Sequence, residues 1–527
     1  MYKVLVTDNL SENGVEILRQ AEGLAVEVKN TLPPQDLLQI IGDYHALIIR
    51  SGAKVTEAVL EAGKNLKVVG RAGIGVDNVD VASASARGVL VMNTPGGNTI
   101  TTAEHAISML LALARSIPQA TASMKEGKWE KNQFMGVELY QKTLGIIGMG
   151  RIGSEVARRA KGMMMEVIVY DPFISAEVAQ EMGVQLADLN RLFAESDFIT
   201  LHTPLTEETR NLINEGTLSR MKDGVRIINC ARGGIVNEQA LYQALKSGKV
   251  AGAALDVFEK EPPKESPLLE LTNFICTPHL GASTAEAQEN VAIAIARQVI
   301  DYLKRGVIRN AVNAPSIEPE VLSKIQPYLD LAERLGSLES QLSEGRIEEI
   351  RIDYRGEIAS MDLAPLTVAI VKGVLSPILQ EMVNTINALP FAKGRGIRVV
   401  ESKSGEDEDF ASIICVGLKT DKGQSEVAGT VVKKREPRVI RINEFRLEAI
   451  PKGHILIFCN IDTPGVLGKI GCLLGESQVN IASIQLSREK AGGRALSLVN
   501  VDQPVPPETL ERLRNLPNIV FAKLVKI

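Results

Sequence analysis

Along roughly the first 315 residues, short runs of β-branched and other apolar residues alternate with amphipathic stretches. The runs predict strands over residues 46–50, 67–70, 89–92, 144–147, 166–170, 198–201, 226–229, 251–257 and 274–277. Helical patterns lie between them, most clearly over residues 101–115 and 153–161. Strands without polar alternation are typical of sheets that are buried on both faces. Strand–helix–strand repeats of this kind predict α/β domains built on doubly wound, Rossmann-like parallel sheets.

A glycine-rich turn at Gly148 divides this region into two units. Such a turn normally ends the first strand of its domain, yet Gly148 lies far down the chain, so a separate α/β unit must precede it. A helix predicted over residues 283–304 begins with the capping-box pattern Ser-Thr-Ala-Glu and is long enough to return to the first unit. We therefore expect a discontinuous first domain, residues 1–97 with 288–315, around a dinucleotide-binding domain at 98–287.

The rest of the chain predicts a different architecture. Residues 316–450 mix helical patterns with short strands, as in an α+β domain, and their acidic run at 405–409 reads as a solvated loop or helix face. Residues 453–527 show the order strand, helix, strand, strand, helix, strand, which is typical of a ferredoxin-like fold. The strands are predicted over 454–460, 480–487, 494–501 and 519–526, and the first helix is expected to take Thr463 as its N-cap and Pro464 as its first residue.

Composition narrows the class of protein. The net charge is −5, which argues against a nucleic-acid-binding or membrane-docking surface. Five scattered cysteines without a CxxC pair favour a reducing compartment over a disulfide framework or a zinc site. The sequence starts with a strand-like run in place of an apolar leader, and no stretch reaches the ~20 apolar residues of a membrane helix. We therefore expect a cytoplasmic protein with no metal, no nucleic-acid partner and no membrane contact.

The glycine motif and the strand after it carry the cofactor prediction. Gly148, Gly150 and Gly153 stand between a strand and a helix, and Asp171 follows the next strand, 18 residues after Gly153. A GxGxxG motif alone is weak and fits ordinary turn glycines, but this context is typical of a dinucleotide site, where a helix N-terminus approaches a pyrophosphate. A carboxylate at the end of the second strand accepts hydrogen bonds from ribose hydroxyls and repels a 2′-phosphate. The motif therefore predicts NAD in preference to NADP.

Three loops at the carboxyl ends of later strands carry Arg232, Glu261 and His279, and ligands bind at such ends in open α/β sheets. The arginine can hold a substrate carboxylate in a bidentate fork, while the histidine takes a hydroxyl proton and the glutamate orients its ring. Each residue alone is more often structural, but together in this setting they favour hydride transfer on a 2-hydroxy acid. The other four histidines are assigned no chemistry: His45, His105 and His454 read as structural, and His202 borders the cofactor loop.

The sequence resembles a known family at the same positions. Five motifs carry the resemblance, at residues 70–78, 229–234, 277–282, 462–467 and 479–481. The first three are similar to the D-isomer-specific 2-hydroxyacid dehydrogenases, the second and third of them in particular to the phosphoglycerate dehydrogenase branch, and the last two are similar to an ACT regulatory domain. The resemblance to the long form of that branch covers essentially the whole chain. It implies an intervening domain at 316–450 and an ACT domain at 453–527.

The resemblance also implies a role for individual residues. The implied catalytic set is Arg232, Glu261 and His279. Implied NAD contacts are Gly148, Gly150, Arg151, Ile152, Gly153, Asp171, Thr203, Cys230, Ala231, Arg232, Asp256, His279, Leu280, Gly281 and Ala282. Implied substrate contacts are Arg50, Ser51, Arg71, Gly73, Asn98, Arg232 and His279, with Lys131 reaching a neighbouring subunit's site. Implied effector contacts are Asn460, Asp462 and Asn480. Alternatives stay open for four of these residues. Arg50 and Arg71 could form structural salt bridges instead. Asp462 could merely support the start of a helix, and Asn480 could occupy a turn.

The implied activity is NAD-dependent oxidation of 3-phospho-D-glycerate to 3-phosphooxypyruvate, the committed step of L-serine biosynthesis, with L-serine as effector and a homotetramer as the assembly. Two alternatives stay open. A hydroxypyruvate or glyoxylate reductase of the same family would share the site but would not need an effector domain. A non-enzymatic NAD-sensing binding protein would share the fold, although an intact arginine, glutamate and histidine set counts against it.

Overall fold

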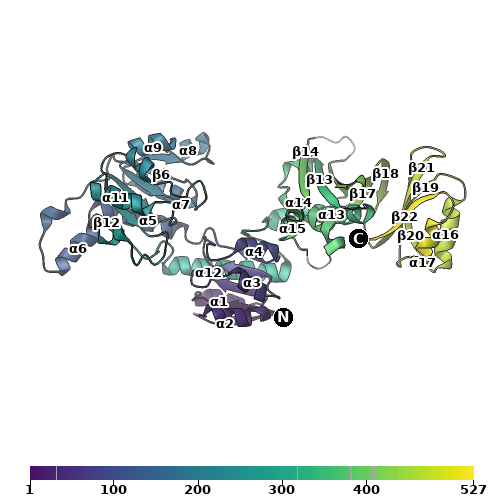
Figure 1. Cartoon of the computed structure of the whole chain (residues 1–527), viewed down its shortest axis with the longest axis horizontal. Coiled ribbons are helices and arrows are strands. Elements are labelled where there is room, and N and C mark those ends of the chain that lie inside the picture. Colours follow the sequence, from purple (N-terminus) through teal and green to yellow (C-terminus); the bar gives the residue numbers. More distant parts are fainter. Residues whose placement is uncertain (31, 317–318, 380–382, 406–409, 434) are drawn as a thin grey trace.

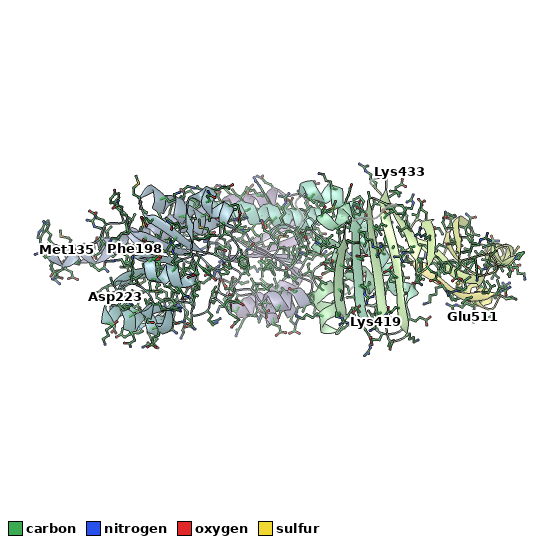
Figure 2. The ribbon with its side chains drawn as sticks, turned by 90° about the horizontal axis from the view of Figure 1, so that it is seen from above. Met135, Phe198, Asp223, Lys419, Lys433 and Glu511 are labelled. Carbon is green, nitrogen blue, oxygen red and sulfur yellow. The ribbon has the colours of Figure 1, made fainter. Side chains whose placement is uncertain are left out.

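The computed structural model describes residues 1–527 apart from 31, 317–318, 380–382, 406–409 and 434. Four sheets follow one another along an elongated molecule, with the second sheet at one end and the fourth at the other (Figure 1). Met135 and Glu511 mark these two extremes when the molecule is seen from above (Figure 2). In the described part of the chain, no helix combines the length and the apolar character that crossing a bilayer requires.

The first sheet is parallel, with strand order β2-β1-β3-β4-β5. Its strands are β1 (Tyr2–Val6), β2 (Leu24–Val28), β3 (Ala46–Ile49), β4 (Val68–Arg71) and β5 (Leu90–Met92), and its helices are α1 (Glu12–Gln20), α2 (Pro34–Ile40), α3 (Glu57–Ala62) and α4 (Val81–Ala86). A helix from much later in the chain, α12 (Ala285–Arg305), packs on this sheet through Val291, Ile295 and Val299. Gly70 permits the approach, because a Cβ there would lie 2.8 Å from the Ile295 side chain.

The predicted start of α12, at residue 283, is two residues too early, because the helix begins at Ala285. Its N-cap is Thr284, whose hydroxyl accepts a hydrogen bond from the Ala287 amide at 3.2 Å, and not Ser283. The capping-box pattern therefore identified the helix but not its boundary, because two consecutive hydroxyl residues offer the same cap chemistry.

The second sheet is also parallel, with order β12-β11-β10-β9-β6-β7-β8. Its strands are β6 (Thr143–Ile147), β7 (Glu166–Tyr170), β8 (Gln185–Leu186), β9 (Phe198–Leu201), β10 (Val225–Asn229), β11 (Val250–Leu255) and β12 (Phe274–Cys276). The accompanying helices are α5 (Thr99–Ala114), α6 (Ile117–Lys125), α7 (Arg151–Gly162), α8 (Ala176–Met182), α9 (Leu189–Glu195), α10 (Glu215–Ser219) and α11 (Glu238–Ser247). Separate apolar cores form on its two faces. The prediction of doubly wound parallel sheets is confirmed.

The third sheet is mixed, with order β14-β13-β15-β16-β17-β18; β13 and β14 are parallel and the other pairs antiparallel. Its strands are β13 (Ile347–Gly356), β14 (Arg398–Ser404), β15 (Ser412–Thr420), β16 (Gly423–Val432), β17 (Glu436–Ile442) and β18 (Phe445–Ala449), and its helices are α13 (Pro319–Leu342), α14 (Ala364–Leu379) and α15 (Ala388–Gly394). Lys419 and Lys433 lie at opposite ends of the strands (Figure 2).

The α+β class predicted for this region is confirmed, but the expectation of short strands is wrong. The strands reach 10 residues because antiparallel pairing along β13, β15 and β16 continues through polar positions that the sequence pattern reads as loop. Of the acidic run at 405–409, residues 406–409 lie outside the described part of the chain.

The fourth sheet confirms the predicted βαββαβ order. Its antiparallel strands, in the order β20-β21-β19-β22, are β19 (His454–Ile461), β20 (Ile481–Arg488), β21 (Arg494–Val501) and β22 (Ile519–Lys526), and α16 (Val466–Glu476) and α17 (Pro507–Arg514) accompany them. The predicted helix start at Thr463 and Pro464 is wrong. The helix begins at Val466 because Gly465 takes a left-handed conformation, with φ of 89°, and interrupts it. Ile457, Leu498 and Val525 of this sheet share one core with the third sheet.

Candidate active site

A cleft of about 350 Å³ lies between the first and second sheets. The first unit contributes part of residues 71–77 together with Pro95. The second contributes Asn98, Thr102, the glycine turn and the loops at the ends of its strands. The lining residues are Arg71, Ile74, Gly75, Asp77, Pro95, Asn98, Thr102, Gly150, Arg151, Ile152, His202, Thr203, Pro204, Cys230, Ala231, Arg232, His279, Gly281 and Ala282. The cleft therefore gathers many of the residues that the sequence singled out.

The three motif glycines have different steric environments. Gly148 has φ of 94°, and a Cβ there would lie 2.6 Å from the carbonyl oxygen of His202. A Cβ on Gly153 would lie 2.1 Å from the Gly148 carbonyl oxygen, so the helix α7 packs directly on the turn. Gly150 is the N-cap of α7 and faces open space, with nothing within 4 Å of a built Cβ. This open space in front of free helix amides fits a pyrophosphate.

Asp171 lies directly after β7 and is held against the glycine turn. Its Oδ2 accepts a hydrogen bond from the Met149 amide at 2.6 Å, and its Oδ1 accepts one from the Phe173 amide at 2.8 Å. A carboxylate oxygen has two lone pairs, so each oxygen keeps one acceptor position. That geometry fits hydrogen bonds from two ribose hydroxyls.

Four buried polar atoms that belong to cleft residues have no hydrogen-bond partner among the described residues: Arg71 Nε, Asn98 Oδ1, His202 Nδ1 and Thr203 Oγ1. Burial lowers the pKa of His202 to about 4, so its ring is neutral at pH 7. An unsatisfied buried polar group costs about 1–3 kcal/mol, which a polar ligand in the cleft would offset. The residues present therefore fit a dinucleotide and a polar substrate.

Glu261 and His279 form a close pair, in which His279 lines the cleft and Glu261 does not. Glu261 Oε2 lies 2.9 Å from His279 Nδ1, and Glu261 Oε1 accepts a hydrogen bond from the Phe258 amide at 3.1 Å. Because a carboxylate is acceptor-only, Nδ1 carries the proton in this contact. In the neutral ring Nε2 is then the unprotonated nitrogen, which is the state a general base requires.

Two arginines approach each other across the cleft from different sheets. Arg232 Nε lies 3.2 Å from Asp77 Oδ2, and its guanidinium extends over Gly75, where a Cβ would lie 2.2 Å from Nη2. Arg71 lies over Gly73 in the same way, with 1.5 Å between a built Cβ and Nη1. Burial, and then the positive charges of Arg232 and Arg50, lower the pKa of Arg71 to about 10. This concentration of positive charge favours an anionic ligand.

Several predicted site residues do not line the cleft. The Asp256 carboxylate has no exposed surface and accepts hydrogen bonds from the Leu280 amide at 2.7 Å and the Gly281 amide at 2.8 Å, so it holds the His279 loop. Burial raises its pKa, but hydrogen bonds from His105, Thr277 and Leu280 outweigh that effect and lower it. Arg50 donates to the carbonyl oxygen of Asn9 at 3.0 Å. Also outside the lining are Ser51, Gly73, Gly148, Gly153, Asp171, Glu261, Leu280 and Lys131.

Lys131 lies in a 3₁₀ turn (Lys131–Phe134) beyond α6, on an arm that projects from the second sheet (Figure 1).

The sequence analysis missed two residues that line the cleft, Asp77 and Thr102. Asp77 stands in the run at 70–78 that carries the resemblance, and its acidic side chain among basic candidates was the signal available. Thr102 gave no signal, because a threonine in an apolar helix is ordinary.

The predicted effector residues do not come together in the fourth sheet: Asn460 and Asp462 lie at one end of it, and Asn480 lies at the opposite end. Asp462 pairs with Arg488 at 3.0 Å, and Asn480 donates to Asp502 Oδ2 at 2.7 Å. Asn460 is buried; its Nδ2 donates to the Ile461 carbonyl oxygen at 2.9 Å, while its Oδ1 has no partner among the described residues. Asp462 and Asn480 thus each have a partner already, and Asn460 retains an unsatisfied acceptor.

Family models match three segments of the chain. A model of the NAD-binding domain of D-isomer-specific 2-hydroxyacid dehydrogenases matches residues 107–281, the intervening domain of D-3-phosphoglycerate dehydrogenase matches residues 324–443, and an ACT domain matches residues 454–518. The first of these confirms the prediction of NAD as cofactor.

Solved structures match the first two units. A Thermus thermophilus protein, TT0316, matches with a TM-score of 0.55 and 36% identity over 59% of this chain and 99% of its own. The D-lactate dehydrogenase of Aquifex aeolicus, complexed with NAD and lactic acid, matches with a TM-score of 0.53 and 31% identity over 59% of this chain and 100% of its own.

Known proteins match the whole length. The D-3-phosphoglycerate dehydrogenase of a Synechocystis species is 47% identical over 100% of this chain and 95% of its own length. The D-3-phosphoglycerate dehydrogenase of Archaeoglobus fulgidus is 46% identical over the full length of both chains, and that of Bacillus subtilis is 41% identical, again over both full lengths. Similarity that runs through the catalytic, intervening and ACT regions alike means that the chain belongs to the D-3-phosphoglycerate dehydrogenases of the D-isomer-specific 2-hydroxyacid dehydrogenase family.

Proposed function

We propose that the chain catalyses the NAD-dependent oxidation of 3-phospho-D-glycerate to 3-phosphooxypyruvate, the committed step of L-serine biosynthesis. One observation carries the proposal: His279, which is paired with Glu261, lines the same cleft as Arg71, Arg232 and the glycine turn. We propose the functional units as residues 1–97 with 288–315, residues 98–287, residues 316–450 and residues 453–527.

In the proposed mechanism NAD, when bound, supplies the hydride acceptor. Arg232 holds the substrate carboxylate, because its fork reaches the cleft from β10 while Asp77 orients it. His279 accepts the hydroxyl proton at Nε2 as the C–H bond breaks, and Glu261 stabilises the resulting imidazolium through Nδ1. The substrate thus loses a hydride and a proton, and the product is the 2-oxo acid.

Cofactor choice in this proposal depends on Asp171. Gly148, Gly150 and Gly153 shape the turn for the pyrophosphate, and the following carboxylate accepts hydrogen bonds from the ribose. A 2′-phosphate would meet the negative charge of Asp171 and is rejected. The remaining NAD contacts inferred from the sequence lie on the strand ends around the cleft, of which Arg151, Ile152, Thr203, Cys230, Ala231, Gly281 and Ala282 line it.

Recognition of the substrate phosphate is assigned to Arg71 and Arg50. Both belong to the first unit, and Arg50 is close enough to Arg71 to lower its pKa. A solved glyoxylate reductase matches only 59% of this chain. A reductase of unphosphorylated acids binds no phosphate, so it would not need the Arg50 and Arg71 cations. A non-enzymatic NAD sensor transfers no proton, so it would not need the Glu261–His279 pair.

The test is a steady-state assay of NADH formation. We expect 3-phosphoglycerate to be oxidised with NAD, and hydroxypyruvate and glyoxylate to be reduced with much lower kcat/KM than 3-phosphooxypyruvate. Equal or higher efficiency on the unphosphorylated acids would replace the proposal by the reductase alternative. Failure to oxidise or reduce any of these acids, with NAD still bound, would replace it by the NAD sensor.

We further propose that L-serine binds the fourth sheet and inhibits the reaction. The α16 N-terminus follows Asp462, at the end of the sheet that also holds Asn460, and its free amides attract a carboxylate. The unsatisfied Asn460 Oδ1 accepts a hydrogen bond from the ammonium or hydroxyl group. Binding there changes the reaction through the core that the fourth sheet shares with the third.

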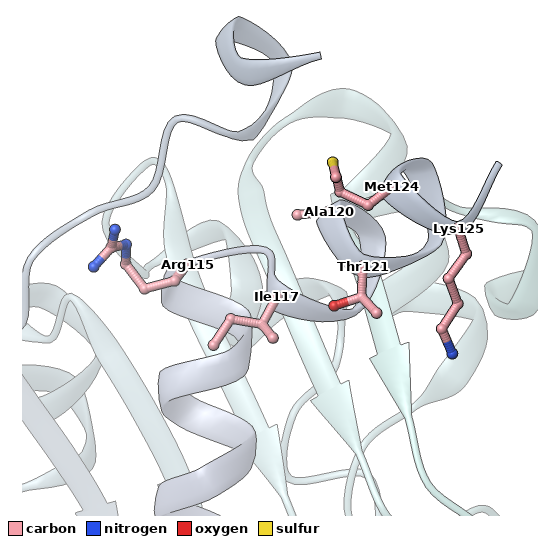
Figure 3. A pocket seen from close by; sticks show the side chains of 6 residues that line it. All are labelled: Arg115, Ile117, Ala120, Thr121, Met124 and Lys125. Carbon is pink, nitrogen blue, oxygen red and sulfur yellow. The ribbon is translucent and has the colours of Figure 1, made fainter. Parts of the chain in front are cut away.

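We also propose a homo-oligomer, a tetramer by the family pattern, with a second copy covering the arm at α6. The arm exposes the single tryptophan, Trp129, and Met135, at 81% and 86% of their surface. A shallow hollow of about 580 Å³ runs beside α6, lined by Arg115, Ile117, Ala120, Thr121, Met124 and Lys125 (Figure 3). Exposed apolar surface of this kind marks a protein interface. Lys131, on the same arm, then reaches the partner's cleft.

Sedimentation tests the assembly. We expect the wild-type chain to sediment as a tetramer and the double variant Trp129→Ser with Met135→Ser to dissociate. A monomeric wild-type chain, or a double variant of unchanged mass, would contradict the proposed interface.

A further inference from the structure

The loop that carries His279 is anchored by hydrogen bonds to one buried residue, Asp256. Asp256 Oδ1 accepts hydrogen bonds from the Leu280 amide at 2.7 Å and the Thr277 hydroxyl at 2.5 Å, and Oδ2 accepts one from the Gly281 amide at 2.8 Å. The Asp256 carbonyl oxygen accepts a fourth from the His279 amide at 2.9 Å. Contacts of one residue therefore flank His279 on both sides.

This support is needed because His279 has an unusual backbone conformation. Its φ of 56° lies in the left-handed region, which costs a non-glycine residue roughly 1–2 kcal/mol. Such a conformation persists only where the surroundings over-determine it. Here it directs the ring toward Glu261, 2.9 Å away.

His105 adds a group from α5 to this network. Its Nε2 lies 3.1 Å from Thr277 Oγ1 and 3.2 Å from Asp256 Oδ1. The Thr277 hydroxyl has one proton, which it donates to Asp256, so its oxygen is left to accept from His105. His105 Nε2–H thus donates to the Thr277 oxygen and also faces Asp256 Oδ1, while the Thr277 O–H donates to Asp256. Consecutive hydrogen bonds of this kind strengthen one another.

We propose that His105 is a positioning residue for the catalytic loop, acting through Thr277 and Asp256 on His279. The inference rests on the proposed dehydrogenase function. The sequence alone indicated a structural role for His105. Its hydrogen bonds, however, lead through Asp256 to the backbone amides of Leu280 and Gly281, next to the acid–base residue His279. Thr102 of the same helix also donates to the Gly281 carbonyl oxygen, at 2.8 Å, so α5 holds the loop at two points.

The experiment compares His105→Leu with His105→Gln in the full-length chain. Leucine removes the donor, whereas the glutamine Nε2–H replaces it. Misplacing a reacting group by about 1 Å costs up to roughly 10²-fold in rate, so we expect kcat to fall by roughly 10- to 100-fold in His105→Leu, with a much smaller change in NAD affinity, and to recover largely in His105→Gln. Glu104→Gln, an exposed neighbour on α5 whose ion pair with Arg159 is elsewhere, is the matched control and should keep wild-type kcat.

A double-mutant cycle tests the same chain without relying on one variant. Thr277→Val removes the relay hydroxyl while keeping the shape of the side chain, and should lower kcat to a similar extent. The combination with His105→Leu should lose less than the product of the two single losses, because the two side chains contact each other and the same carboxylate. Multiplicative losses would overturn the inference.

Two further results would also overturn it: wild-type kcat in His105→Leu, or equal losses in His105→Leu and His105→Gln. These outcomes are distinct from failure of the proposed function, which would appear as a wild-type enzyme that forms no NADH from 3-phosphoglycerate.

Discussion

Replacement of Arg71 by methionine tests whether the positive cleft recognises phosphate. The guanidinium is largely buried, and its Nε has no partner among the described residues. Burial and the charges of Arg232 and Arg50 lower its pKa to about 10, so at about 1.4 kcal/mol per pKa unit the cleft holds this charge at a cost of up to about 3 kcal/mol. A phosphate dianion beside it offsets that cost.

The expected loss follows from the same energies. A charged hydrogen bond contributes about 1.5–3 kcal/mol, so the methionine variant should raise KM for 3-phosphooxypyruvate by roughly 10- to 150-fold. Hydroxypyruvate lacks the phosphate and should show a much smaller change. The assay is NADH consumption at varied concentrations of each acid, in the direction of reduction.

Arg87→Met is the matched control. Arg87 belongs to the same unit but forms a surface ion pair with Glu61 at 3.6 Å, so its loss should leave both KM values near wild type. Equal increases in KM for the two acids in Arg71→Met would refute the assignment of phosphate recognition and indicate a structural role. Thermal midpoints of both variants show whether the first unit still folds.

Four further predictions concern separate parts of the molecule. His279→Ala should reduce kcat by roughly 10²–10⁴-fold with NAD binding, measured by fluorescence, largely retained; a wild-type kcat would contradict its role as base. Asp171→Asn should weaken NAD and raise the NADP/NAD ratio of kcat/KM, because the repulsion of a 2′-phosphate is removed; an unchanged ratio would show that this carboxylate does not face the ribose. Asp462→Ala and Asn480→Ala should each abolish inhibition by L-serine, typically 1–3 kcal/mol of coupling, while uninhibited kcat and KM stay near wild type; inhibition at the wild-type serine concentration would place the effector elsewhere. Burial raises the pKa of Glu339 to about 8, so the folded chain keeps a proton that the unfolded chain releases. The free energy of unfolding should therefore fall by up to about 1.4 kcal/mol per pH unit between about pH 5 and 8, and Glu339→Gln should lack this fall. Parallel pH curves of the thermal midpoints of the two proteins would contradict this.

Local patterns in the sequence determined the elements of this protein well. The strands over residues 166–170, 198–201, 494–501 and 519–526 have the bounds that the pattern predicted. The glycine spacing predicted the turn before α7, because positive φ at Gly148 and close packing at Gly148 and Gly153 leave no other residue type suitable at these two positions. These features depend on contacts within a few residues, and such contacts leave a pattern in the chain.

Only the tertiary structure determined how distant groups combine. Arg71 and Arg232 approach each other from two sheets, and no local pattern records that a Cβ at Gly75 would collide with Arg232. His105 shows the same limit. On α5 it is one polar residue in an apolar helix, and its partners Thr277 and Asp256 lie more than 150 positions away. The side chain alone fits a structural histidine, and its role follows from long-range packing that brings its Nε2 to the underside of the catalytic loop.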